Sequence, residues 1–148
     1  MTDTRTHFSI PDVALHCIGG GEIDPADFRG QKLAVFFCPT DREAAAREIA
    51  EYRRLAEEFA DCGVWLLGVL EGTVPPEARQ AAGMPHLSLA TDSDGCGWRY
   101  FEPALRTIGK SGREEGAAFF FERWGSLRRA WPSSGHAHEM LEAARERN

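Results

Sequence analysis

Four cysteines are the residues of this sequence best suited to covalent or redox chemistry. They stand at Cys17, Cys38, Cys62 and Cys96. A cysteine thiolate can act as a nucleophile, reduce a peroxide or bind a metal. No two of the four form a C-x-x-C pair, the mark of a dithiol or zinc motif, and four scattered cysteines are too few for a disulfide-stapled scaffold. The sequence therefore predicts reduced thiols, whose chemistry depends on where the fold places each one.

Two histidines near the C-terminus, His136 and His138, are candidate metal ligands of a weaker kind. Two residues apart on a helix, their side chains point about 200° away from each other, so both cannot bind one ion. We expect solvated or capping histidines, with no metal site and no cofactor.

Composition limits the class of protein. The chain has 148 residues, 43% of them apolar, and a formal net charge of −6. This length predicts one domain over residues 1–148, and the acidic balance disfavours nucleic acid and anionic lipid as partners. The longest apolar stretch, Val64–Leu70, is too short to cross a bilayer, and residues 1–12 lack the features of a signal peptide. We therefore expect a cytoplasmic protein with no membrane partner.

A strand–helix–strand unit is predicted in the first half of the chain. Residues 32–37 (KLAVFF) and 64–70 are apolar on both faces, which is typical of strands inside a sheet. Apolar residues at helical spacing between them predict a helix over 41–60. Short connections make this a right-handed βαβ unit with parallel strands.

The predicted long helix has a start signal and a charged face. Thr40 and Glu43 match a capping box, in which each side chain satisfies a backbone N–H at the helix start. Alternating arginines and glutamates, Glu48 among them, predict a solvated face.

Shorter elements surround this unit. Strands are expected over 13–17, 22–23, 87–90, 117–121 and 127–131, helices over 75–83, around Trp98 and from Gly135 onward, and a mobile loop over 107–115. The order predicts an α/β domain with a mixed central sheet, helices on both faces and an N-terminal β-hairpin.

Six segments carry a resemblance to a known family. They are 8–12 (FSIPD), 27–30 (DFRG), 35–39 (VFFCP), 64–69 (VWLLGV), 92–95 (DSDG) and 135–137 (GHA). In their order and spacing the chain resembles a peroxiredoxin of the AhpC/TSA superfamily, closest to the bacterioferritin-comigratory (PrxQ-like) group. The resemblance covers nearly the whole chain and implies a thioredoxin-like, three-layer fold.

The resemblance implies an active site at the start of the first long helix. There a Pro-x-x-x-Thr-x-x-Cys loop holds a thiolate over unpaired backbone N–H groups, and a nearby arginine helps to polarise the peroxide. The thiolate becomes a sulfenic acid that another thiol resolves. In this chain Pro39 is present, Glu43 stands at the threonine position, Ala46 at the peroxidatic cysteine and Gly116 at the arginine.

These departures decide the functional hypotheses. Alanine has no sulfur to oxidise, and a carboxylate at Glu43 would repel a thiolate or a peroxide anion. The leading hypothesis is a peroxiredoxin-like protein without peroxidase activity that acts as a redox-associated binding or interaction module. An alternative is a thiol-dependent antioxidant oxidoreductase that uses Cys38 or Cys96 at a relocated site. A third is a small-molecule pocket at Pro39, with Glu43 as its polar anchor.

The four cysteines differ in their expected reactivity. Cys38 ends a central strand, where a displaced nucleophile is conceivable but packing as a small hydrophobe is favoured. Cys96 follows a turn and is expected to be exposed, as a reactive or resolving thiol or as an inert one. Cys62 lies at a helix C-terminus, where the dipole disfavours a thiolate, and Cys17 has no obvious partner.

The partners are less specified by the sequence. Trp98, Tyr100 and Phe101 could form an exposed apolar patch through which two copies pair as a homodimer. A redox protein or a small molecule remains the other kind of partner.

Overall fold

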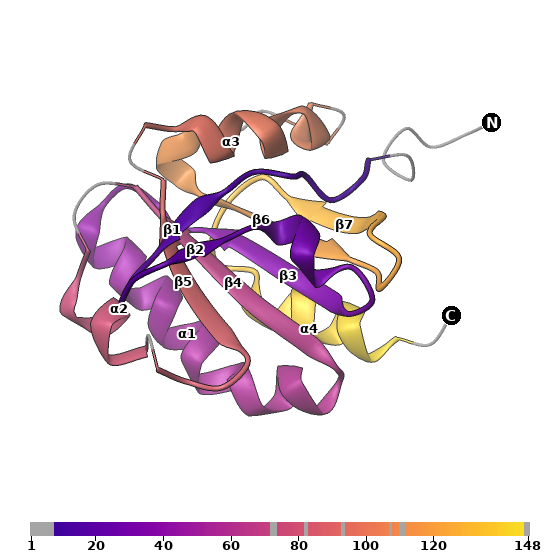
Figure 1. The fold of residues 1–148 in the computed structure, drawn as a ribbon, viewed down its shortest axis with the longest axis horizontal. Helices are drawn as coiled ribbons and strands as arrows, with labels where there is room; N and C mark the ends of the chain where they lie inside the picture. Colours follow the sequence, from indigo (N-terminus) through magenta and orange to yellow (C-terminus); the bar gives the residue numbers. More distant parts are fainter. Residues whose placement is uncertain are drawn as a thin grey trace.

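A seven-stranded mixed sheet forms the centre of the computed structural model (Figure 1), which describes residues 8–71, 74–81, 83–92, 94–106, 108–109 and 112–146. The strand order is β2-β1-β5-β4-β3-β6-β7. The strands are β1 (Leu15–Cys17), β2 (Glu22–Ile23), β3 (Lys32–Phe37), β4 (Val64–Leu70), β5 (Leu87–Thr91), β6 (Ala117–Phe121) and β7 (Leu127–Trp131). The helices are α1 (Arg42–Asp61), α2 (Pro76–Ala81), α3 (Cys96–Phe101) and α4 (Ala137–Arg145), with 3-10 turns η2 (Pro25–Phe28), η3 (Glu102–Leu105) and η4 (Arg113–Glu115).

The predicted βαβ unit is confirmed. Strands β3, β4 and β5 are parallel, and the remaining pairs, β3 with β6 among them, are antiparallel. Strand β3 is buried on both sides, because every residue from Leu33 to Phe37 is fully inaccessible. The carboxyl end of β3 thus leads directly into α1 from the middle of the sheet.

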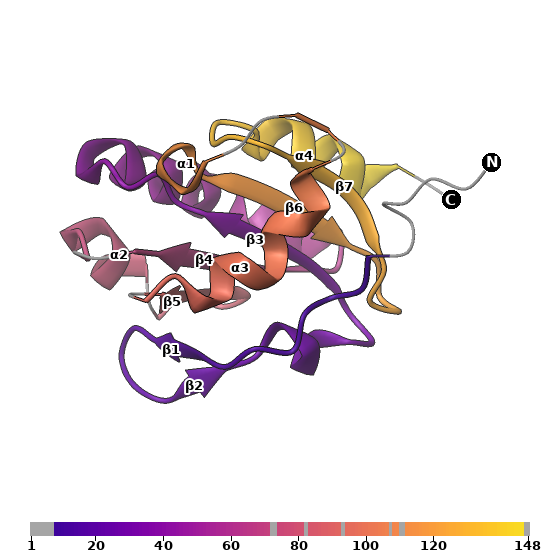
Figure 2. The same ribbon diagram turned by 90° about the horizontal axis from the view of Figure 1, so that it is seen from above.

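Helices cover both faces of the sheet (Figure 2), as the sequence predicts. On one face α1, α2 and α4 pack over apolar side chains that include Phe36, Tyr52 and Met140. On the other face α3, η3 and the N-terminal arm cover a second cluster that includes Phe37, Phe101 and Phe119. The three-layer α/β architecture with an N-terminal hairpin is confirmed.

The start of α1 differs from the predicted capping box. Asp41, not Thr40, is the N-cap, and its carboxylate accepts a hydrogen bond from the Ala44 N–H at 2.9 Å. The expectation for Thr40 is wrong because an aspartate one residue later makes an equally good cap and moves the start of the helix. Glu43 lies in the first turn and is exposed.

The expected start of the final helix is also corrected. The final helix begins at Ala137, with His136 as its N-cap, and not at Gly135. The stretch predicted as a mobile loop over 107–115 contains the 3-10 turn Arg113–Glu115, while Thr107, Lys110 and Ser111 lie outside the described residues.

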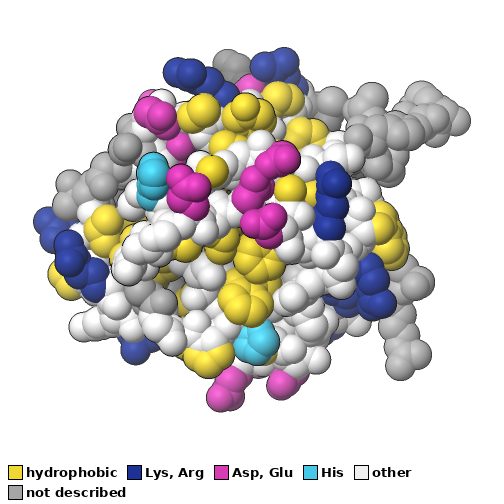
Figure 3. Space-filling model, in the orientation of Figure 1, with side chains coloured by type: hydrophobic (Ala, Val, Ile, Leu, Met, Phe, Trp, Pro, Cys, Tyr) yellow, Lys and Arg dark blue, Asp and Glu magenta, His cyan; other side chains and the backbone are white. Residues whose placement is uncertain are grey.

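Surface charge on the face of Figure 3 is mixed. Lysine and arginine side chains are dispersed at the edges of this face, and acidic groups lie near its middle beside hydrophobic ones. Among the helices that the structure describes, none combines the length and the apolar character of a membrane span.

Candidate functional site

The carboxyl end of β3 and the start of α1 place Cys38 and Pro39 at the position where open α/β sheets bind ligands. Cys38 is fully buried, and its N–H donates to the Val69 carbonyl at 2.9 Å. This backbone bond continues the β3–β4 ladder by one residue and fixes the thiol inside the core. The preference for Cys38 as a packed hydrophobe agrees with this burial.

Burial also sets the protonation of Cys38. Desolvation raises the pKa of its thiol far above the ordinary value, nearby Glu48 adds to the rise, and Arg113 opposes it only in part. A thiol in this environment stays protonated, so it is a poor nucleophile.

Of the four positions that the resemblance assigns to the family site, Glu43 and Ala46 lie on the first turns of α1, whereas Pro39 precedes this helix and Gly116 precedes β6. Ala46 is half-buried and Glu43 is exposed. The Asp41 carboxylate satisfies one helix-terminal N–H and adds negative charge at the positive end of the helix dipole. The helix end is therefore already compensated by carboxylates of the chain itself.

Gly116 cannot hold the arginine that the resemblance would place there. Its backbone has φ 78° and ψ −176°, a region accessible essentially to glycine alone. A Cβ at this position would lie 2.5 Å from the Phe37 carbonyl oxygen and 3.2 Å from the Pro39 nitrogen. The close approach of the Gly116 backbone to the end of β3 thus excludes any side chain.

Arg113 brings a guanidinium to the site instead, and the sequence analysis missed it. Its Nη1 donates to the Cys38 carbonyl at 2.6 Å. Its guanidinium carbon lies 5.4 Å from the Phe37 ring centre and 5.8 Å from that of Trp98. The only signal in the sequence was an arginine three residues before Gly116 in a polar stretch, which did not distinguish it from a solvated loop residue.

Two further nitrogens of the Arg113 guanidinium can donate hydrogen bonds. Its Nε and Nη2 are buried and have no hydrogen-bond partner among the described residues. Burial lowers the pKa of the guanidinium, while Glu71 and other anionic groups oppose that effect. Because an arginine remains charged in proteins, this half-buried side chain is a cation whose buried donors no described residue accepts from.

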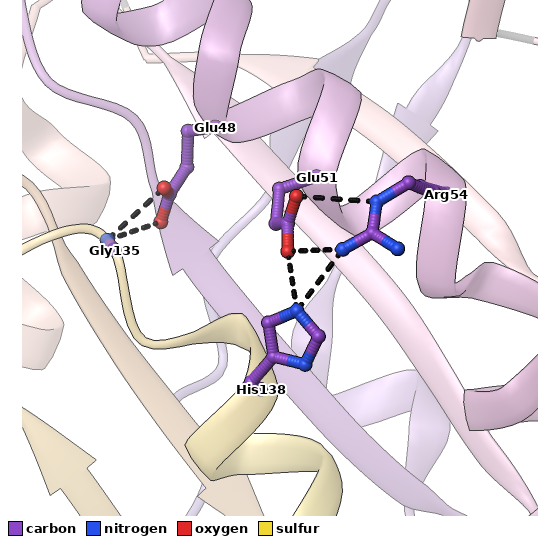
Figure 4. A network of polar contacts seen from close by, with 5 residues as sticks. All are labelled: Glu48, Glu51, Arg54, Gly135 and His138. Atoms are coloured by element: carbon purple, nitrogen blue, oxygen red, sulfur yellow. Dashed lines mark hydrogen bonds and ion pairs between the residues drawn. The ribbon is translucent and has the colours of Figure 1, made fainter.

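Glu48 is buried beneath α1, so its predicted place on the solvated face is wrong. Its carboxylate accepts the Gly135 N–H at 3.0 and 3.2 Å, which ties α1 to the start of α4 (Figure 4). Desolvation raises the pKa of Glu48, and the Gly135 hydrogen bond opposes the rise. The solvated part of this helix face is Glu51 with Arg54, which pair at 2.7 Å and contact His138 on α4.

The other cysteines are free thiols. Cys96 is exposed at the first position of α3, and its N–H donates to the Asp94 carboxylate at 3.0 Å. Cys17 and Cys62 are half-buried, and desolvation raises the pKa of Cys17. Of the two candidate thiols, Cys96 alone is accessible to a reagent or a partner.

Asp92 is, like Arg113, a charged residue near the site whose role the sequence did not reveal. It is buried, and its carboxylate accepts the N–H groups of Gly97 and Trp98, both at 2.9 Å. This contact fixes the start of α3 and so positions the Trp98 ring against Arg113.

The aromatic residues of α3 do not form one exposed patch. Phe101 is fully buried and contacts Phe37 and Phe119, while Tyr100 is 49% exposed. The suggested patch is wrong because the helix turns Phe101 into the core. The route to a homodimer through these three residues therefore loses its support.

The histidines take structural roles. His136 Nδ1 lies 2.6 Å from a Glu139 oxygen, and His138 contacts Glu51 at 2.7 Å. Within the described ranges, no group of three or more His, Cys, Asp or Glu side chains is placed to hold a metal ion.

Comparisons with known proteins find one family model and several solved structures that are similar to this chain. The AhpC/TSA family model matches residues 7–94. Among solved structures, Xanthomonas campestris peroxiredoxin Q is 24% identical with a TM-score of 0.69, covering 97% of this chain and 94% of that one. The X. campestris bacterioferritin comigratory protein, described in complexes that bear on alkyl peroxide reduction, is 22% identical with a TM-score of 0.71, covering 89% of each chain.

A more distant match has the same fold. A putative thiol:disulfide interchange protein DsbE from Chlorobium tepidum is 18% identical with a TM-score of 0.67, covering 92% of each chain. None of the curated proteins matched the sequence. At these identities the structural matches establish the thioredoxin-like peroxiredoxin fold.

Proposed function

Since the AhpC/TSA family model matches more than half of its residues, the chain belongs to that family, and we propose that it is a member without peroxidase activity that serves as a redox-associated binding or interaction module. One feature of the sequence supports the proposal: when the family motif is matched from Pro39 onward, Ala46 falls at the position of the peroxidatic cysteine. Peroxide reduction by this family needs a sulfur at that position to attack the O–O bond.

The surroundings of Ala46 support the proposal. Asp41 caps the helix, and Glu43 adds a second carboxylate to the first turn. Both would repel a thiolate or a peroxide anion at the helix end. The nearest sulfur, Cys38, is fully buried, and its pKa is raised by that burial.

A binding role is supported by the donors that this end of the sheet retains. Two nitrogens of Arg113, Nε and Nη2, donate to no acceptor in the described part of the chain. Unpaired buried donors in a folded protein mark places where water or a ligand supplies the acceptor. Trp98 and Phe37 frame the guanidinium, so an acceptor at this place would meet both charge and aromatic surface.

The test is peroxide consumption coupled to thioredoxin and its reductase, with hydrogen peroxide and an organic hydroperoxide. The wild type is expected to match a variant in which all four cysteines are serine. A rate well above that variant would overturn the proposal. The positive control is Glu43→Thr with Ala46→Cys, which restores a sulfur and removes one carboxylate while leaving Gly116 intact.

A second candidate is a thiol oxidoreductase that uses Cys96, because this thiol alone of the two candidates is exposed. In native protein Cys96→Ser is expected to abolish the fastest reaction with a thiol reagent, whereas Cys17→Ser leaves it. Oxidation by peroxide that Cys96→Ser prevents would favour this candidate. A native protein whose thiols all react slowly and equally would exclude it.

A further inference from the structure

Two adjoining hollows lie at the amino end of β3, at the opposite end of this strand from Cys38. One, of about 340 Å³, is lined by Gln31, Lys32 and Arg123 together with the end of α1 at Cys62 and Gly63. The other, of about 230 Å³, shares Lys32 and Arg123 and extends over the β6–β7 turn. We call the two together the amino-end groove. Strand β3 separates it from the family site by roughly 17 Å.

The described lining of the groove has a net charge of +1, because Lys32, Arg123 and Arg128 outnumber two carboxylates. Its two carboxylates, Glu122 and Glu146, both pair with Arg128, at 2.7 and 2.9 Å. Lys32 and Arg123 line both hollows and have no ion pair within the described residues. In a chain of net charge −6, two unpaired cations beside one hollow favour an anionic occupant.

An aromatic side chain lies beside these cations. Trp124 is 68% exposed and lines the second hollow with Lys32 and Arg123. An exposed indole gains nothing from the core, but it offers a flat apolar face to a ring or an aliphatic group. The combination suits a ligand with a negative group at one end and a planar group at the other.

We propose that the amino-end groove binds a small organic phosphate that carries a planar group, with Lys32 and Arg123 on the phosphate and Trp124 against the ring. The first hollow, of about 340 Å³, has the volume of a small-molecule site, and it shares Lys32 and Arg123 with the second hollow, where Trp124 lies. This site is separate from the one at α1, so the proposal can be tested independently of the proposed function.

The experiment is a titration of the full chain with phenyl phosphate, inorganic phosphate and phenol, followed by calorimetry and by amide chemical shifts. Phenyl phosphate is expected to bind about tenfold more tightly than inorganic phosphate, because the ring adds contact with Trp124. Phenol is expected to bind least. Amides at residues 30–32 and 122–124 should shift together, and binding should weaken as NaCl rises from about 0.05 to about 0.5 M.

Matched variants separate this site from general surface charge. Lys32→Ala with Arg123→Ala should weaken phenyl phosphate binding at least about tenfold. Arg47→Ala with Arg53→Ala removes the same charge from the exposed face of α1 and should leave binding unchanged. Trp124→Ala should erase the preference for phenyl phosphate over inorganic phosphate.

Either of two results overturns the proposal. One is the absence of shifts in the groove at millimolar phenyl phosphate, and the other is an equal loss of binding in both double variants. Thermal melting of each variant confirms that the fold is intact before the comparison is made.

Discussion

Replacement of Gly116 by alanine tests whether the Gly116 backbone packs too closely against the end of β3 to accept a side chain. A Cβ at Gly116 would lie 2.5 Å from the Phe37 carbonyl oxygen, closer than nonbonded carbon and oxygen approach each other. The backbone there also has φ 78° and ψ −176°. The residue must therefore both leave its conformation and push the end of β3 away from β6.

The two effects add to a large expected destabilisation. Forcing a non-glycine residue into this region costs about 1–3 kcal/mol. Relieving overlap inside a packed core costs about 1–3 kcal/mol more. We expect Gly116→Ala to lower the free energy of unfolding by about 4 kcal/mol, which for a chain of this size is a fall in Tm of about 10 °C.

Two other glycines provide controls in the same assay. Gly63 has φ 77° but nothing within 4 Å of its Cβ position, so Gly63→Ala should cost only about 1 kcal/mol. Gly83 has open space and no positive φ, so Gly83→Ala should fall within about 0.5 kcal/mol of the wild type. Urea unfolding followed by circular dichroism gives all three values. A Gly116→Ala variant no less stable than Gly63→Ala would refute the argument from close approach.

Three further predictions concern buried polar groups. Because burial raises the pKa of Glu48 above 4.5, its stabilising contribution is present below that value and lost as pH rises through the raised pKa. Glu48→Gln should therefore gain stability relative to wild type as the pH is raised above 4.5, measured by urea unfolding at each pH. Tyr52→Phe removes a buried hydroxyl without a partner in the described chain, so stability should stay equal or rise by up to about 1 kcal/mol, and a clear loss would show that the hydroxyl is bonded. Asp92→Ala should cost about 2 kcal/mol in thermal melting, because two N–H groups at the start of α3 lose their acceptor, and an unchanged Tm would contradict this role.

The architecture could be predicted because each central element has its own local signal. Apolar residues on both faces of 32–37 and 64–70, with helical spacing between them, specify a βαβ unit with little competition from other structures. The start of α1 was missed by one residue because Thr40 and Asp41 are both good caps, and spacing alone cannot rank them. The second half of the chain has shorter elements, and there the predicted boundaries shifted more often.

The sequence could predict which residue types stand at the site, but not which side chains contact one another there. The absence of a cysteine at Ala46 is visible in the sequence, and so are Pro39 and Glu43. The burial of Glu48 depends on the segment just before α4, almost ninety residues away, which supplies the Gly135 N–H. The inward turn of Arg113 depends likewise on the Cys38 carbonyl and the Trp98 ring, and a single sequence carries no pattern for such contacts.

The departures from the family motif are physically linked. This link predicts which of the variants that restore the motif reacts faster with peroxide. Without a thiolate at position 46, the positive end of α1 has no anion to stabilise, and Asp41 and Glu43 supply negative charge of their own. Ala46→Cys alone would therefore create a thiol whose ionisation the two carboxylates oppose. Adding Glu43→Thr removes one of them, so the thiol of the double variant should react faster with peroxide at neutral pH than that of Ala46→Cys alone. Equal rates in the two variants would show that Glu43 does not control the helix end.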